Sequence, residues 1–327
     1  MDGSTVSGRP SAALKIASAV LVMFLSACAV GRRPAIEHDE RLRRTAALVA
    51  EVKAFGKTLG IEPTEALRQT TQQRPANSML WFWLQRKGTL ALDAAIDIRL
   101  TVGFSIIKEK LGLDRVYPLD GYSVYFRQGN EFADGRSVAT VGFADEDPVR
   151  KVNIIFHEDL HGDANFALPW ETEESIVTPL GSLAAVNFFA HKGDDKNLRR
   201  AQDLIEENRQ LCRELNGLAK EAQRFFARGP LEQARAEVLA LMDKYPTYRR
   251  HFRHEIAGQN PLTALEAKLS HDLAYFRYFD AIVELSEKAP DLQALIADLK
   301  RLPATAGIMG LEAYLVALNR KYALLPQ

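Results

Sequence analysis

The chain has 327 residues, of which 47% are hydrophobic, and its 42 acidic and 42 basic side chains give a formal net charge of zero. This length and apolar content are sufficient for one large domain or two small ones with a substantial core. A neutral chain lacks the basic surface that nucleic-acid partners favour, so we expect no nucleic-acid binding.

The N-terminal segment has the pattern of a targeting signal. Its apolar run, Ile16–Leu25, follows two basic residues and is too short to span a membrane as a mature helix. The run ends in Leu25-Ser26-Ala27-Cys28, which resembles the bacterial lipobox, in which the cysteine is lipidated. An ordinary signal peptide followed by an incidental cysteine is the alternative interpretation.

Lipidation of Cys28 would anchor the protein to a membrane without a spanning helix. Residues 1–27 are then a lipoprotein signal peptide, and residues 28–36 are a tether. Ala29 follows the cysteine where an inner-membrane retention signal would have Asp, so we expect an outer-membrane lipoprotein facing the periplasm. Cys212 is the one other cysteine, so no internal disulfide is expected, and it is interpreted as a small core or interface residue of a helix.

From about residue 36 to Gly112 the pattern predicts mostly helix. Apolar residues recur at helical spacing between Leu48 and Leu59, and Ala94–Leu111 forms a second amphipathic stretch. Trp81-Phe82-Trp83 is predicted to be part of the core rather than a membrane contact.

A small β element is predicted at about 116–144. Tyr122–Phe126 alternates apolar with more polar residues, and Ser137–Phe143 has the composition of a second strand. An edge strand can hold the backbone of an extended peptide by strand addition, and we expect that role for this element.

The rest of the chain is predicted to be helical, with metal-binding helices at about 149–190 and further helices at about 196–325. Apolar residues between Ala201 and Phe225 form a heptad seam, which Gly229-Pro230 ends before a helix at 231–245. The seam predicts packing within the protein, with self-association as the alternative, and the oligomeric state is left open. Three more helices are expected at 261–288, 291–302 and 307–325, with Asp291 as an N-cap.

The fold class expected from these elements is mainly α with a small antiparallel β element, as a single domain over residues 37–327.

The central motif of the chain is His157-Glu158-Asp159-Leu160-His161, which has the form H-E-x-x-H. On a helix, residues four apart share one face, so both imidazoles can bind one metal ion. Glu158 lies between them and can reach a water activated at that ion. The apolar run before the motif, Val152–Phe156, predicts that this helix is packed inside the protein.

A catalytic zinc usually has three protein ligands and one open position. One class of H-E-x-x-H enzymes takes a third histidine six residues after the second; Ala167 occupies that position and excludes this class. The other class takes a glutamate from the following helix, and spacing alone leaves Glu171, Glu173 and Glu174 as alternatives.

The motif and its surroundings resemble the bacterial predicted aminopeptidases, a zincin-like, gluzincin-type family of zinc peptidases often made as lipoproteins. Glu173-Glu174-Ser175 corresponds to the family's N-E-S segment, 17 residues after the first histidine. Gly142–Val149 resembles its stretch before the metal helix, and Asn260–Leu273 resembles its C-terminal segment. The resemblance covers most of the mature chain, at low identity outside the metal helices. Asp159 departs from the small or apolar residue that the family has inside the motif.

This resemblance implies one zinc ion held by His157, His161 and Glu174. Glu173 lies about 100° around the helix from Glu174 and is therefore expected to face solvent. The resemblance also implies a peptide substrate, hydrolysed with Glu158 as general base. The exopeptidase label comes from the family alone, because the sequence assigns no acidic group to the substrate amine; an endopeptidase or cell-wall peptide hydrolase stays open. So does a non-catalytic envelope lipoprotein in which a structural metal joins helices.

Stabilisation of the oxyanion needs a donor beyond the metal. Tyr275, His271 and Tyr278 lie on one predicted helix and are the candidates. Asp163 and Thr178 are candidates for orienting the metal ligands, although Asp163 also fits a plain surface position. The remaining histidines have no ligand-like spacing and are interpreted as surface residues: His38, His191, His251 and His254.

Overall fold

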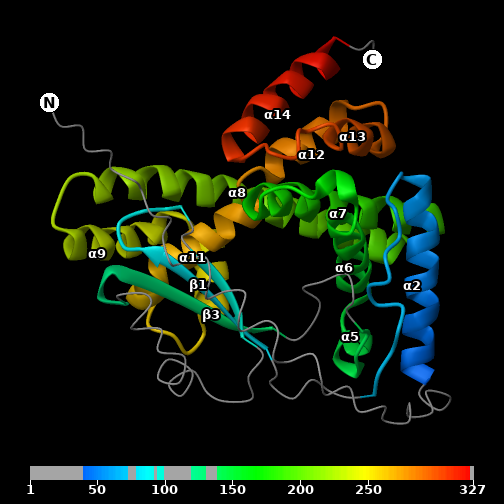
Figure 1. The fold of residues 1–327 in the computed structure, drawn as a ribbon, viewed down its shortest axis with the longest axis horizontal. Helices are drawn as coiled ribbons and strands as arrows, with labels where there is room; N and C mark the ends of the chain where they lie inside the picture. The colour runs from blue at the N-terminus through cyan, green and yellow to red at the C-terminus, as the bar shows by residue number, and fades with distance from the viewer. Residues whose placement is uncertain (1–39, 73–78, 92–93, 99–118, 130–137, 325–327) are drawn as a thin grey trace, which may run out of the picture. The chain divides into compact units, whose positions relative to one another are not determined.

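The computed structural model describes residues 40–72, 79–91, 94–98, 119–129 and 138–324 (Figure 1). The predicted signal peptide, Cys28, the tether and His38 lie outside these ranges, as does the separate contact unit Met1–Ala35. None of the helices in the described ranges combines the length and the apolar content that a membrane span requires.

The described residues are mainly helical with a small antiparallel sheet, as the sequence predicts. The sheet consists of β1 (Met79–Arg86), β2 (Ala94–Ile98) and β3 (Tyr122–Gly129). The α-helices are α2 (Glu40–Thr58), α5 (Val141–Asp145), α6 (Pro148–His161), α7 (Trp170–Lys192), α8 (Asp195–Phe226), α9 (Leu231–Leu241), α10 (Pro246–Glu255), α11 (Pro261–Phe276), α12 (Phe279–Lys288), α13 (Leu292–Leu299) and α14 (Ile308–Ala323).

Two predictions of local structure are wrong. The segments predicted as helix before Gly112 contain two strands, and the sheet has the order β2-β1-β3 with both pairs antiparallel. Four consecutive residues of β1, from Phe82 to Gln85, are buried, so the strand shows no alternation of apolar and polar residues. The burial of Phe82 and Trp83 confirms that they belong to the core. Residues 99–111 lie outside the described ranges.

The prediction of a second strand at Ser137–Phe143 is also wrong. Ser137 is outside the described residues, Ala139 forms one isolated bridge with Thr70, and helix α5 begins at Val141. The Thr140 hydroxyl accepts a hydrogen bond from the backbone N–H of Phe143 at 3.1 Å. This N-cap satisfies a free N–H of the first turn and begins a helix where the sequence looks extended.

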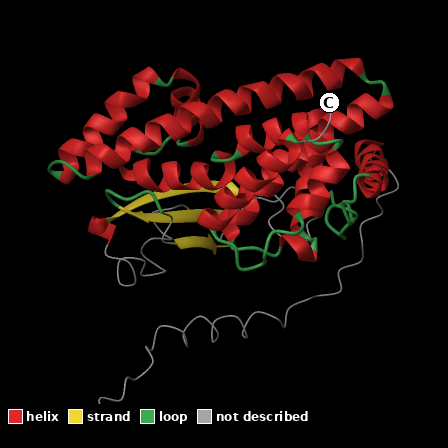
Figure 2. Cartoon of the chain, turned by 90° about the horizontal axis from the view of Figure 1, so that it is seen from above, coloured by secondary structure: helices red, strands yellow, loops and turns green. Residues whose placement is uncertain are grey.

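Helix α11 packs against β1 and β3, and Figure 2 shows helices lying along one face of the sheet. The Ser123 hydroxyl of β3 donates to the carbonyl of Thr263 at 2.9 Å and accepts from the N–H of Ala267 at 3.1 Å. At the exposed edge of β3, the Gln259 side chain accepts from Phe126 N–H and donates to Phe126 C=O, at 3.1 and 2.8 Å. These bonds occupy both backbone groups, so the sheet edge is closed to strand addition at Phe126.

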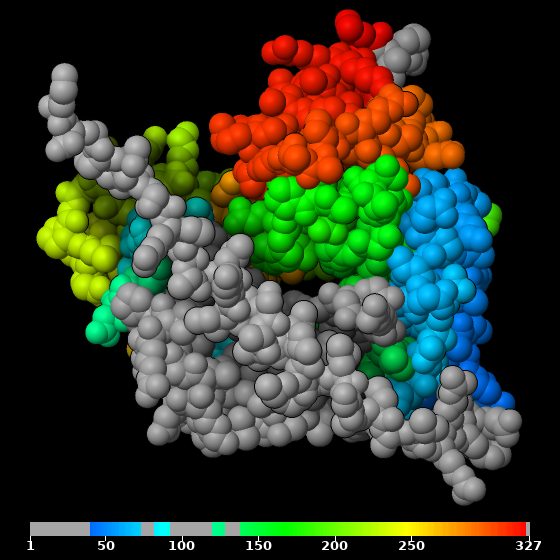
Figure 3. Space-filling view, viewed as in Figure 1, coloured from blue at the N-terminus to red at the C-terminus, as the bar shows by residue number. Residues whose placement is uncertain are grey.

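Helices α6 and α7 are the predicted metal-binding pair, and α2 packs beside them (Figure 3). A Cβ at Gly181 of α7 would lie 3.3 Å from the backbone nitrogen of His157 and 3.2 Å from the side chain of Asn153. The absent side chain therefore lets α7 approach α6 closely at the first histidine of the motif.

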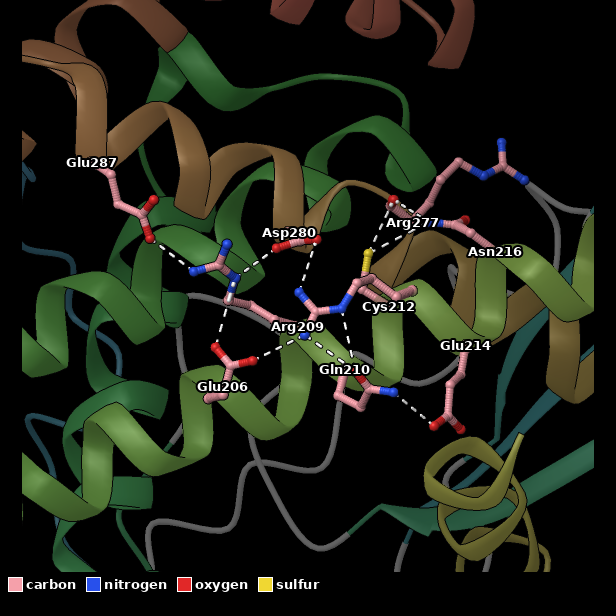
Figure 4. A network of polar contacts seen from close by, with 10 residues as sticks. Glu206, Arg209, Gln210, Cys212, Glu214, Asn216, Arg277, Asp280 and Glu287 are labelled. Carbon is pink, nitrogen blue, oxygen red and sulfur yellow. Dashed lines mark hydrogen bonds and ion pairs between the residues drawn. The ribbon is translucent and has the colours of Figure 1, made fainter. Parts of the chain in front are cut away.

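Helix α8 confirms the predicted long helix, and most of its seam is buried against α7, α9, α10 and α11, as expected for packing within one chain. The predicted helix over 261–288 is divided into α11 and α12 at Arg277-Tyr278. The Arg277 carbonyl, left free by the break, accepts from Asn216 Nδ2 at 2.9 Å and from Cys212 Sγ at 3.4 Å (Figure 4). Cys212 is buried in this contact, which agrees with a structural role. Asp291 caps α13 as predicted.

Candidate metal centre

Helix α6 positions the two histidines of the motif. Its N-terminus is capped by Asp147, whose carboxylate accepts from the N–H of Val149 at 3.0 Å, and Pro148 occupies the first turn. The apolar side of the helix is buried, as the sequence predicts, through Val149, Val152, Ile155, Phe156 and Leu160. Packing of this side fixes the rotation of α6, and His157 and His161 then project together toward α7.

Helix α7 brings Glu174 to the two imidazoles. The Nε2 atoms of His157 and His161 are 3.0 Å apart. Glu174 Oε2 lies 3.5 Å from His157 Nε2, and Glu174 Oε1 lies 3.5 Å from His161 Nε2. Ligands at ~2.0–2.1 Å from a tetrahedral zinc ion are separated by roughly 3.3 Å, so the three residues have the spacing that zinc requires.

The chemistry of this cluster also fits a metal ion. Glu174 is 5% exposed, and its Oε2 is buried without a hydrogen bond. A buried carboxylate oxygen without a partner is costly, and a cation at this position would remove that cost. In the described part of the chain, His157, His161 and Glu174 are the one group of three or more candidate ligands that converges in this way. A zinc ion held by three protein ligands keeps an open position, which is the arrangement of a catalytic site.

Glu173 does not face solvent, and this prediction is wrong. Its Oε1 lies 2.7 Å from Nδ1 of His161, and its side chain is 16% exposed. A carboxylate on the outer nitrogen of a metal-binding histidine fixes the ring orientation and leaves Nε2 free to bind the metal. Glu174 is therefore the carboxylate next to the Nε2 atoms of both imidazoles, and Glu173 contacts only the outer nitrogen, Nδ1, of His161.

Burial and neighbouring charges shift the pKa values of the two histidines in opposite directions. Burial lowers the pKa of His157 to about 4, and the positive charges of His161 and Arg127 act in the same direction. Burial also acts to lower the pKa of His161, but Glu173 and Glu174 outweigh it and raise that pKa to about 10. The two carboxylates thus favour a positive charge at this place in the protein.

Tyr275 joins the cluster from α11. Its hydroxyl donates to Glu174 Oε1 at 3.2 Å. The residues next to this pair in the chain are also hydrogen-bonded: the Ser175 hydroxyl donates to the backbone carbonyl of Ala274 at 2.7 Å. Burial raises the pKa of Tyr275 well above its usual value, and the negative charge of Glu174 adds to this effect, so the phenol stays protonated.

His271 lies one turn before Tyr275, and the two ring centroids are 4.8 Å apart. The side chain is buried; its Nδ1 is 3.0 Å from Asp272 Oδ1, and its Nε2 has no hydrogen bond. Burial lowers the pKa of His271 to about 4, so its ring is neutral near pH 7. Tyr278 lies at the helix break, partly buried against the hydrophobic core, and is not part of this cluster.

Asp159, the unusual residue of the motif, lies on the other side of α6. It is about 200° around the helix from each histidine. Its carboxylate forms a buried ion pair with Lys53 of α2 and accepts from the N–H and hydroxyl of Thr64 at 2.9 and 2.7 Å. Asp159 therefore joins α2 to α6, on the side of α6 opposite to the candidate ligands.

The structure also gives the burial of Asp163, of Thr178 and of the other described histidines. Asp163 is not a surface residue, because it is buried in an ion pair with Lys300. His251 is half-buried, 3.5 Å from Asp272, rather than on the surface, whereas His191 and His254 are exposed as predicted. Thr178 shares the face of α7 with Glu174, and its hydroxyl is buried without a hydrogen bond.

Comparison of the chain with protein-family models, with curated proteins and with solved structures gives no match.

Proposed function

We propose that this protein is a zinc-dependent peptide hydrolase with a zincin-like, gluzincin-type site. The observation that carries the proposal is the convergence of His157 Nε2, His161 Nε2 and Glu174 at 3.0–3.5 Å, with Glu158 between the histidines. Helix α6 follows β3 in the chain and packs on the glutamate-bearing helix α7, which also fits this class.

Zinc in such a site would supply a Lewis acid that polarises the scissile carbonyl and makes water a better nucleophile. Glu158 is placed to accept the proton of the attacking water and then deliver it to the leaving amine. It is 6% exposed, and its negative charge contributes to the raised pKa of Tyr275. Tyr275 is the donor for the developing oxyanion, because its phenol remains protonated beside Glu174.

Glu158→Gln tests the hydrolytic mechanism. The amide cannot accept a proton, so kcat is expected to fall by about 10²–10⁴-fold while the zinc content stays at one ion per chain. Peptide hydrolysis and zinc content are measured on the same preparations, with the exposed Glu51→Gln as a matched control. Full hydrolysis by Glu158→Gln would refute the assignment of the general base.

Tyr275→Phe tests the oxyanion donor. Loss of one such donor costs about 10²–10³ in kcat, with little change in KM and with zinc retained. Steady-state kinetics and zinc titration separate two roles, since the tyrosine also donates to Glu174. A variant that loses zinc affinity but keeps its kcat when saturated with zinc would show that Tyr275 only orients the ligand.

A structural metal site in a non-catalytic lipoprotein is the competing hypothesis. Structural zinc sites are closed by a fourth protein ligand. The described residues provide three, which favours catalysis.

Digestion of a peptide library, read by mass spectrometry, separates aminopeptidase from endopeptidase activity. Glu171 and Glu173 in the first turn of α7 are the acidic side chains that we propose as alternatives for an amine anchor, and Glu173 contacts His161.

We further propose that this hydrolase acts in the bacterial envelope. Support comes from Leu25-Ser26-Ala27-Cys28, which predicts lipid attachment at Cys28 and an outer-membrane anchor facing the periplasm. Absence of labelled palmitate from the chain after expression in a Gram-negative host would remove this part of the proposal.

A further inference from the structure

Strand β3 and helix α11 run alongside each other toward the candidate metal centre. Alternate residues of a strand share one face, so Ser123, Tyr125 and Arg127 all point to the side covered by α11. Ser123 contacts the start of the helix, at Thr263 and Ala267. The Tyr125 ring lies farther along, 5.3 Å from the ring of His271. This order places Arg127 at the last turn of α11, where Tyr275 is found.

Aromatic contacts connect Arg127 with the centre. Its guanidinium carbon is 5.7 Å from the centroid of the Trp83 ring. The Trp83 ring meets His271 edge-to-face at 4.4 Å, and His271 packs on Tyr275, whose hydroxyl donates to Glu174. Arg127 itself is exposed, and His157 and His161 have 19% and 23% of their side chains exposed. A cation thus stands on the solvent side of a partly open site.

The surroundings of Arg127 indicate what it can bind. The Tyr275 hydroxyl donates to Glu174 at the centre itself, whereas the Arg127 guanidinium stands over Trp83, which reaches the centre through His271. It is therefore placed for a group of the substrate beyond the scissile bond. Guanidinium groups recognise carboxylates through two parallel hydrogen bonds, and stacking on an aromatic ring holds them in position. The positive charge of Arg127 also lowers the pKa of His157 and of His271, as expected for a cation facing the centre.

We infer that Arg127 is a specificity-determining residue that binds a carboxylate of the peptide substrate. This inference rests on the proposed peptide hydrolysis and adds the substrate class: peptides with a carboxylate near the scissile bond. The carboxylate comes from the C-terminus of a short peptide or from an acidic side chain, and the two sources have the same chemistry at the guanidinium.

The test uses the zinc-loaded chain and matched peptides. A cleaved peptide from the library is compared with its C-terminal amide and with its Glu-to-Gln counterpart. Wild type is expected to prefer one of the carboxylate forms by about ten- to a hundredfold in kcat/KM, mainly through KM. The pair that shows the preference identifies the source of the carboxylate.

Arg127→Gln is expected to bring this ratio close to one, and Arg127→Lys is expected to keep part of it. Arg86→Gln, which removes the same charge at the other end of the sheet, is the control and should keep the ratio. An undiminished preference in Arg127→Gln would overturn the inference. So would an equal loss of kcat for all peptides, which is the result expected of a transition-state donor.

A binding measurement separates this inference from the proposed function. Dipeptide hydroxamates bind zinc without turnover. A dipeptide hydroxamate with a free carboxylate and the same compound with that carboxylate as an amide are therefore titrated into zinc-loaded wild type and Arg127→Gln. A preference for the acid that depends on Arg127 supports the inference even if no peptide is cleaved. Peptide cleavage without any carboxylate preference overturns the inference and leaves the proposed function in place.

Discussion

Glu174→Ala is expected to abolish stable zinc binding, whereas Glu173→Ala is expected to weaken it by about 10–100-fold. The difference follows from their positions: Glu174 lies 3.5 Å from the Nε2 atoms of both histidines, and Glu173 contacts the outer Nδ1 of His161. Loss of the first residue leaves two imidazoles, which are too few for a tetrahedral protein site. Loss of the second removes a group that only orients one ligand.

Zinc affinity is measured by competition with a chromophoric chelator at constant pH, and far-UV circular dichroism verifies the fold of each variant. Glu171→Ala is the matched control, because Glu171 lies in the same first turn of α7. Equal losses of affinity in Glu173→Ala and Glu174→Ala would contradict the division of roles between the two carboxylates.

Asp159→Ala is expected to destabilise the protein by about 3–5 kcal/mol, because it leaves the ammonium group of Lys53 buried without its partner. Lys53 and Asp159 have 5% and 2% of their side chains exposed, and Asp159 also satisfies two groups of Thr64. Replacing both charges, as in Lys53→Met with Asp159→Leu, is expected to recover much of this loss. The free energy of unfolding is obtained from urea titration.

The exposed ion pair between Lys192 and Glu51 provides the comparison, and Glu51→Ala should cost no more than about 1 kcal/mol. Since Asp159 points away from the ligands, its alanine variant should still bind zinc under conditions where it is folded. A loss of zinc from the folded variant, with little change in stability, would place Asp159 in the metal centre instead.

The helical part of the fold was accessible from sequence because its signals are local. The capping residue Asp291 and the regular apolar spacing in α8 lie within a few residues of what they specify. Strand β1 was missed because both of its faces are buried, which removes the period of two. The break between α11 and α12 contains neither Gly nor Pro, and its free carbonyl at Arg277 is satisfied by α8, more than 60 residues away along the chain.

In the candidate centre, too, the parts that the sequence predicts depend on local signals. The H-E-x-x-H spacing identifies His157 and His161 by helical geometry, and the resemblance to a peptidase family selects Glu174. The contacts that surround these residues connect distant segments: Asp159 with Lys53, Ser175 with Ala274, and Arg127 with Trp83. Glu173 was misjudged because helical geometry gives its direction around α7 but not the side chain that comes to meet it there.

The ion pair between Lys53 and Asp159 also sets a limit for shortening the chain. Residues before Glu40 lie outside the part that the structure describes, whereas α2 supplies Lys53 to the motif-bearing helix. A shortened form that starts after Thr58 would leave Asp159 buried without its cation and would uncover the side of α6 on which α2 packs. The smallest useful fragment for expression and crystallisation therefore includes α2, even though this helix lies about 100 residues before the motif.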